Sequence, residues 1–255
     1  MIAESGAMAA VLAENARLVA LLKAHGIDWQ MPPATMRVEP STLAQESSKL
    51  TADQKIAIFR RLFAGRTDVY PIRWESKAGK SVYSPACANE WRAGVCEKPR
   101  IKCSDCGNRS FLPLTDQVIY DHLAGHHTVG VYPLRSDDTC CFLAVDFDEA
   151  DWCADALAFV RSCRELNVPV ALEVSRSGSG AHVWIFFAAP VPAREARRLG
   201  TAIISHTCAR TQQLKLSSYD RLFPNQDTMP KGGFGNLIVL PLQKATRTRQ
   251  QRIRG

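Results

Sequence analysis

The sequence has no long hydrophobic run. Its apolar stretches stay well short of the about 20 consecutive residues that a bilayer-spanning helix needs. The N-terminus also lacks a basic segment followed by the apolar core of an export signal. We therefore expect a protein without a membrane-embedded part, located in the cytoplasm.

The sequence also lacks the pattern of a disulfide framework, although it contains nine cysteines in 255 residues. Their count is odd, their spacing is uneven and no export signal precedes them, so we expect reduced thiols, some of them on metal. The net charge is +7, which fits a polyanionic partner. A basic tail at 244–255 carries five of these charges, which leaves +2 for the rest of the chain.

Residues 142–148 form the first stretch with chemical content. They read Phe-Leu-Ala-Val-Asp-Phe-Asp, and in an extended strand Asp146 and Asp148 would lie on the same face. Two neighbouring carboxylates repel each other and raise each other's pKa unless a cation lies between them. Oxygen ligands of this kind suit Mg²⁺ or Mn²⁺. An Asp-x-Asp pair alone is common, so it does not establish catalysis.

A glycine-rich turn follows about thirty residues later. Gly178 and Gly180 allow a tight turn and a close approach of the backbone to a ligand, and His182 opens the next strand at 183–187. Taken alone, this stretch is an ordinary hairpin. In the order Asp-x-Asp strand, helix and Ser-Gly-x-Gly-x-His hairpin, however, the sequence resembles the archaeo-eukaryotic primase superfamily.

Within that superfamily the sequence is most similar to the primase-polymerase domain of the TOTE conflict systems. The resemblance spans roughly 59–243 and rests, besides the two stretches above, on residues 84–87, 89–91, 102–106, 111–116, 219–227 and 230–243. It implies an α+β fold with an RNA-recognition-like catalytic core. It also implies template-dependent nucleotidyl transfer, as a DNA primase or polymerase, on single-stranded DNA or RNA with nucleoside triphosphates. A helicase, in the same chain or a separate one, is the implied partner.

The resemblance also implies which residues form the site. A third acidic residue would complete the Mg²⁺ or Mn²⁺ site, with Asp220 as the first choice and Asp227 as the rival. The residues expected to hold the incoming nucleotide are Arg176, Ser177, Gly178, Gly180, His182 and Lys231. Without the resemblance, the Lys-Gly-Gly-Phe-Gly stretch that begins at Lys231 would be an ordinary flexible loop.

Four cysteines form a second cluster. Cys87, Cys96, Cys103 and Cys106 are separated by eight, six and two residues, a density that suits a tetrahedral structural Zn²⁺. We expect a zinc module at 84–110 inserted in the catalytic domain. Basic residues surround the cluster, so contact with template or primer is a secondary hypothesis.

The remaining chain divides into segments. The 3-4 spacing of Met8, Val11, Asn15, Leu18 and Leu22 predicts an N-terminal helix at 1–28. That spacing fits both a coiled coil, which would form a homodimer, and a helix packed on its own domain. A linker at 29–50 and a catalytic domain at 51–243 follow. Three histidines, His122, His126 and His127, are expected in an exposed loop.

Two alternative functions stay open. The chain could be a zinc-containing module that binds single-stranded nucleic acid without catalysis. It could also be a metal-dependent nuclease, since carboxylate sites with two metals hydrolyse phosphodiesters as well.

Overall fold

The computed structural model describes residues 17, 20, 21, 23–25, 50–75, 81–148, 151–211, 218–244 and 253–254. It divides the chain into two compact units, Met1–Leu50 and Thr51–Gly255. In the first unit Arg17, Ala20, Leu21, Lys23 and Ala24 are helical. The predicted seam from Met8 to Leu22 and the linker up to residue 49 lie outside the described residues. Among the described residues, no helix has the length and apolar character needed to cross a membrane.

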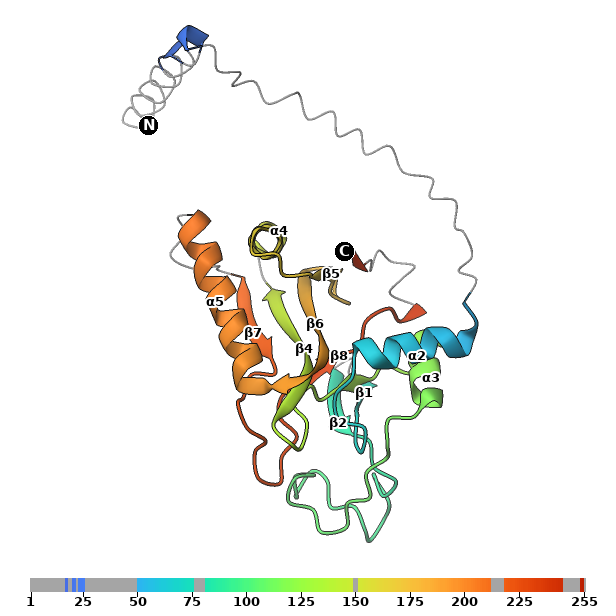
Figure 1. Cartoon of the computed structure of the whole chain (residues 1–255). Helices are drawn as coiled ribbons and strands as arrows, with labels where there is room; N and C mark the ends of the chain where they lie inside the picture. The colour runs from blue at the N-terminus through green and yellow to red at the C-terminus, as the bar shows by residue number, and fades with distance from the viewer. Residues whose placement is uncertain are drawn as a thin grey trace, which may run out of the picture. The chain divides into compact units, whose positions relative to one another are not determined.

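A five-stranded antiparallel sheet forms the centre of the second unit (Figure 1). The strand order is β7-β4-β6-β5-β9, so the two longest strands, β4 and β6, lie side by side at its centre. This mixture of sheet and helices confirms the α+β class expected from the sequence. The bounds of the strands are Thr139–Asp148 for β4, Ala171–Val174 for β5, Gly180–Pro192 for β6, Tyr219–Phe223 for β7 and Ile253–Arg254 for β9.

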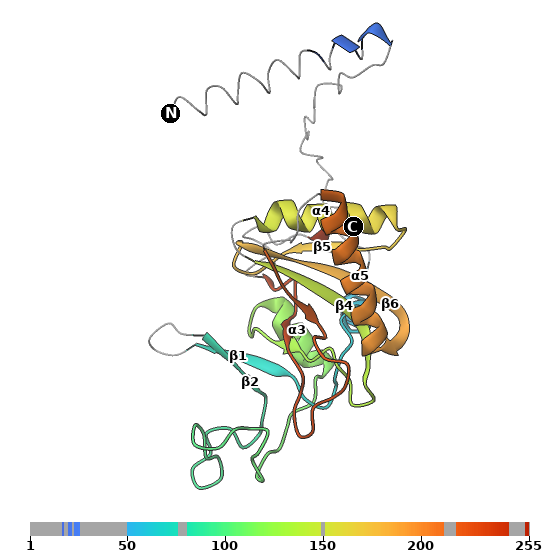
Figure 2. The ribbon, with the colours of Figure 1, turned by 90° about the vertical axis from the view of Figure 1, so that its left-hand side faces the viewer.

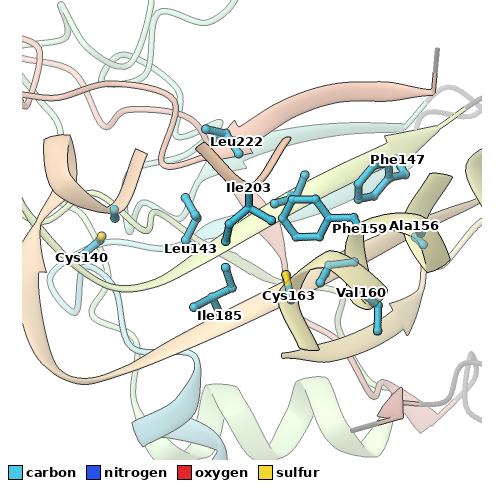
Figure 3. Packing of buried hydrophobic residues seen from close by; sticks show 14 of the residues in the cluster. Cys140, Leu143, Phe147, Ala156, Phe159, Val160, Cys163, Ile185, Ile203 and Leu222 are labelled. Atoms are coloured by element: carbon cyan, nitrogen blue, oxygen red, sulfur yellow. The ribbon is translucent and has the colours of Figure 1, made fainter. Parts of the chain in front are cut away.

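Two helices, α4 (Trp152–Glu165) and α5 (Ala193–Thr211), pack on one face of this sheet (Figure 2). The alternation of β4 sends Leu143, Val145 and Phe147 to that face, where all three are buried. Figure 3 shows Leu143 and Phe147 packed with residues of both helices, such as Phe159 and Ile203. This layer fixes the position of β4 from one side.

The opposite face of the sheet is covered by α2 (Ala52–Leu62) and α3 (Asp116–Ala124) with the segments that follow them. Thr51 and Gln54 begin α2 with a capping box, since each side chain accepts a hydrogen bond from the backbone N–H of the other residue. Beyond the end of α2, Phe63 contacts the buried Trp184 of β6 edge-on, with ring centres 4.9 Å apart. The sheet is therefore buried on both faces at its centre.

Shorter strands and the cysteine segment extend from this second face (Figure 2). A hairpin is formed by β1 (Pro71–Glu75) and β2 (Ser81–Pro85), while β3 (Gly130–Val131) pairs with β8 (Ile238–Val239). The four clustered cysteines lie in the turns between β2 and α3, at 86–115, which we call the cysteine segment. A single β-bridge there joins Cys87 to Phe111. None of the described residues of this segment pairs with a strand of the five-stranded sheet.

The expectation for His122 was wrong. This side chain is completely buried at the end of α3, where Nε2 donates a hydrogen bond to the carbonyl oxygen of Pro241 at 3.0 Å. Its Nδ1 accepts from the backbone N–H of Val129 at 3.3 Å. His126 and His127 are exposed, as expected. His122 is therefore a structural residue that satisfies backbone groups of two segments far apart in the chain.

Gly65 provides a test of how α2 is attached to the rest of the fold. A Cβ atom there would lie 2.3 Å from the carbonyl oxygen of Tyr132 and 2.6 Å from Val131 Cγ2, so Gly65→Ala must displace backbone. We expect it to lower the free energy of unfolding by about 1–3 kcal/mol, measured by urea denaturation. The matched control is Gly107→Ala, where no atom lies within 4 Å of the added methyl group. Equal losses in the two variants would contradict this packing.

Candidate active site

Three carboxylates gather at one end of the sheet. One oxygen each of Asp146, Asp148 and Asp220 lies within 4.8 Å of the other two. Asp146 is 8% exposed, whereas Asp148 and Asp220 are open to solvent. Asp227, the rival third acid, instead forms an ion pair with Arg197 of α5. The structure thus brings the first-choice residues together and leaves Asp227 outside the group.

An irregularity between β4 and β7 explains the position of Asp220. Val145 pairs with Leu222 and Phe147 pairs with Tyr219, so two residues of β7, Asp220 and Arg221, lie opposite the single Asp146. Regular alternation would send Asp220 to the face of Leu222, which belongs to the core under α4 and α5. The extra residue reverses this alternation and turns Asp220 toward Asp146.

Without a bound cation, the acidic group is costly because Asp146 is buried. Loss of hydration raises the pKa of Asp146 to about 6; the charge of His182 opposes this rise, and the charges of Asp148 and Asp220 add to it. Arg221 Nε donates to Asp220 Oδ2 at 2.6 Å and offsets part of the negative charge. Three carboxylates with no nitrogen or sulfur donor among them fit a hard cation such as Mg²⁺ or Mn²⁺.

His182 lies beside the acidic group because the register of β4 and β6 pairs it with Asp146. Its Nε2 is 3.5 Å from Asp146 Oδ1, and its Nδ1 is 3.2 Å from Glu173 Oε2 on β5. Burial lowers the pKa of His182, but the hydrogen bond and charge of Glu173, together with Asp146 and Asp148, outweigh burial and raise it. The imidazole is therefore held between two carboxylates.

Glu173 is a site residue that the sequence analysis missed. Its side chain is 1% exposed, and Oε2 also accepts a hydrogen bond from Trp184 Nε1 at 2.8 Å. Its charge thus has two donors, His182 and Trp184, on the neighbouring strand. The available signal was an acidic residue inside the apolar strand Val-Ala-Leu-Glu-Val, where an unpaired charge would be expensive.

The predicted nucleotide turn between β5 and β6 lies at the same end of the sheet. Gly180 pairs with Asp148, and a Cβ atom at Gly180 would lie 2.3 Å from Asp148 Oδ1. Gly178 has φ +81°, a conformation that favours glycine. Ser177 Oγ accepts from the N–H of Ser179 at 3.2 Å, and Arg176 is exposed. The geometry therefore favours glycine at both positions, and the Ser177 side chain stabilises the turn itself.

Lys231 lies in an exposed loop that contacts the cysteine segment instead. In this loop Phe234 packs against Tyr132 and Phe111, with ring centres 5.1 and 5.2 Å away. The carbonyl oxygen of Gly233 accepts from Arg66 at 3.3 Å. None of the contacts described for this loop joins Lys231 to the three aspartates. A nucleotide-binding role of Lys231 stays a prediction.

The four predicted zinc ligands line one small cavity of about 20 Å³. The backbone N–H of Ser110 donates to Cys87 Sγ at 3.3 Å, and Lys98 lies close enough to Cys103 to interact with it. All four thiols are free, but no three of these described sulfur atoms come within 4.8 Å of one another, as the aspartate oxygens do. Zinc therefore stays a prediction.

A scan against protein families matches residues 54–253 to the family described as TOTE conflict system, Archaeo-Eukaryotic Primase domain. The chain belongs to this family. The resemblance seen in the sequence is thereby confirmed, and membership in this primase family supports nucleotidyl transfer at the family level.

A search of solved structures finds similarity to the polymerase domain of ligase D from Mycobacterium tuberculosis, solved in complex with DNA. The match covers 75% of each chain at 12% sequence identity, with a TM-score of 0.43. A search of curated proteins gave no match for this primase-family chain.

The raised pKa of Asp146 predicts a pH-dependent gain of stability in Asp146→Asn. Without added Mg²⁺, the wild type loses stability as pH rises from about 4 to 6, because the unfolded carboxyl ionises before the folded one. Asparagine has no such loss, so above pH 6 the variant should be more stable by on the order of 2 kcal/mol. The difference should vanish near pH 4.

The measurement is thermal unfolding of both proteins across this pH range, without chelator so that any zinc stays bound. Adding Mg²⁺ is the internal control, since it should stabilise the wild type and not the variant. A variant that is less stable at every pH would contradict this account of Asp146.

Proposed function

We propose that this chain is a template-dependent nucleotidyltransferase, a DNA primase or polymerase acting on single-stranded nucleic acid. The observation that carries the proposal is the group of Asp146, Asp148 and Asp220 beside His182, in a chain of a primase family. Asp146, Asp148 and Asp220 would hold Mg²⁺ or Mn²⁺. When bound there, the metal would lower the pKa of an attacking 3′-hydroxyl and stabilise the leaving pyrophosphate.

The protein residues have separate tasks in this proposal. Asp146 must be ionised to bind a cation, so its raised pKa favours binding at neutral rather than acidic pH. Glu173 Oε2 accepts a hydrogen bond from His182 Nδ1–H, so Nε2 is the ring nitrogen that faces the site. His182, with Arg176 of the adjacent turn, would then bind and orient the triphosphate through charge and hydrogen bonding. We assign no nucleophilic role to His182.

Primer extension tests the assignment of the three acids. Asp146→Ala/Asp148→Ala and Asp220→Ala should each reduce product by at least about 100-fold, the scale seen when one electrostatic group of a reaction centre is removed. Asp227→Ala is the matched control and should extend like the wild type, because Asp227 is paired with Arg197. A labelled primer on single-stranded DNA, with Mg²⁺ or Mn²⁺ and each nucleotide set, gives the measurement.

Other results would favour the alternatives. Product that forms without a primer would identify a primase. Strand cleavage that needs metal but no nucleoside triphosphate would favour the nuclease. A folded wild type that binds single strands without extending them would favour the binding module, and equal losses in the Asp220 and Asp227 variants would contradict the assigned site.

We also propose that Cys87, Cys96, Cys103 and Cys106 hold one structural Zn²⁺. The support is their lining of one cavity and the N–H donated to Cys87 Sγ, because such donors stabilise a thiolate. Such a site has no open position for catalysis. Its role would be to hold together the segment between β2 and α3, which consists of turns and contains no helix or extended strand.

Elemental analysis tests the zinc site. We expect about one zinc per chain in protein purified without chelator, and a loss of most of that zinc, with a lower unfolding temperature, in Cys103→Ser. Cys153→Ser is the control, because Cys153 is exposed on α4 and outside the cluster. Zinc-free wild type with an unchanged unfolding temperature would contradict the proposal.

The partners expected from the sequence remain predictions. These are a helicase in the same chain or a separate one, and a homodimer formed by the N-terminal helix. The single-stranded template is the partner on which the proposed chemistry depends.

A further inference from the structure

Two tryptophans project into solvent on the hairpin and cysteine segment. Trp74 on β1 is 46% exposed, and Trp91 between the first two cysteines is 65% exposed, the largest value among the large apolar residues that the structure describes. Single exposed apolar residues are normal on protein surfaces. These two differ because one polar network holds both of them.

The network converges on the carboxylate of Glu90. Trp74 Nε1 donates to Ser84 Oγ at 2.9 Å, and Ser84 Oγ donates to Glu90 Oε1 at 2.9 Å. Lys98 Nζ donates to the same oxygen at 2.5 Å. Glu90 and Lys98 are only 8% and 16% exposed, and Lys98 Nζ lies 5.8 Å from the centre of the Trp91 ring. A nearly buried ion pair therefore connects the two exposed rings.

The backbone at Trp91 gives a second reason to regard this surface as functional. Its φ of 58° lies in the left-handed region, which bulky side chains rarely occupy. Turn hydrogen bonds on both sides enforce it, from Glu90 N–H to Cys87 O and from Arg92 N–H to Asn89 O, each 3.1 Å long. Strain of this kind persists where the surroundings impose it and gathers at ligand-binding positions. Here it keeps an indole pointing outward.

The charges around the rings indicate the kind of partner. Residues 84–110 contain five basic and three acidic side chains, and two of those acids, Glu90 and Glu97, are already paired with Lys98 and Arg100. Arg92 and Lys102 are exposed and have no ion pair with another described residue. Aromatic rings among cations are the usual platform for unpaired bases, since each base stacks while the cations attract its phosphate.

The hairpin also lies near the candidate active site. Burial raises the pKa of Tyr83 on β2, and the positive charge of Arg176 opposes this rise. Tyr83 and Arg176 therefore lie near each other. Arg176 belongs to the turn between β5 and β6, beside the acidic group. A strand stacked on the hairpin could therefore continue toward that group.

We propose that Trp74 and Trp91, joined through Ser84, Glu90 and Lys98, form a stacking surface for bases of a single-stranded template. The inference rests on the proposed function for the identity of the partner. It assigns template binding to the β1–β2 hairpin and the cysteine segment, separately from the residues that carry the chemistry.

The test is equilibrium binding of the full chain to fluorescent oligo(dT), followed by anisotropy without nucleotide or added Mg²⁺. Trp74→Ala and Trp91→Ala should each raise Kd roughly 10-fold, the scale of losing one stacked base. Trp74→Phe and Trp91→Phe should stay near the wild type because they keep a stacking ring. Tyr120→Ala is the matched control, since Tyr120 is an exposed aromatic residue on α3, with 45% exposure.

An abasic oligonucleotide of the same length separates stacking from charge. The two alanine variants and the wild type should bind it with equal Kd, because it has phosphates but no bases to stack. Alanine variants that bind oligo(dT) like the wild type would overturn the proposal, and so would a wild type that does not bind it. An equal loss in the alanine and phenylalanine variants would also overturn it, because that result indicates altered folding rather than lost stacking.

The result is independent of the proposed chemistry. Wild type that extends primers, with alanine variants that bind template normally, would refute the stacking surface and leave the nucleotidyltransferase intact. Wild type that cannot extend primers, with alanine variants that lose binding, would support the surface and refute the enzyme.

Discussion

The register of β4 against its two neighbours is the constraint on which the candidate site depends. Pairing with β6 places His182 opposite Asp146 and Gly180 opposite Asp148, while the irregular pairing with β7 brings Asp220 to the same place. A slip of one residue would exchange the two faces of β4 and send its carboxylates into the core under α4 and α5. The buried rows on both faces, with Phe142 on one and Leu143 on the other, prevent that slip.

The same register explains how a costly group of charges is tolerated. The face of β4 that carries Phe142 and Ala144 is packed under α2, and it becomes acidic only at the end of the strand, where Asp146 is still buried and Asp148 is exposed. Behind the acids, Glu173 is bound by His182 and Trp184, so the imidazole of His182 lies between the carboxylates of Asp146 and Glu173. The packed cores on both faces of the sheet stabilise the fold and so offset the destabilisation that the acidic group causes.

Much of the site could be predicted because it depends on short-range periodicity. Alternation along one strand was enough to place Asp146 and Asp148 on one face, and the glycine turn with His182 followed from local pattern. The choice between Asp220 and Asp227 could not be derived, because an extra residue in β7 reverses the alternation and only the paired strand reveals it. Glu173 was missed, and His122 was wrongly expected in an exposed loop, for a related reason. Their partners, His182 and Pro241, are set by tertiary packing, which no local pattern records.

A chain of contacts connects the cysteine segment to the acidic group. Phe111, five residues before α3, packs against Phe234. Two residues after Phe234, Asn236 Nδ2 donates to the carbonyl oxygen of Leu222 in β7 at 3.0 Å. Leu222 is the residue where the irregular pairing with β4 begins. A zinc ion bound by this segment would thus act beyond the segment itself, because the contact of Phe111 with Phe234 lies next to the loop whose Asn236 binds β7. Since β7 positions Asp220, the cysteine segment and the proposed metal site are linked through packed rings and one amide rather than through the chain alone.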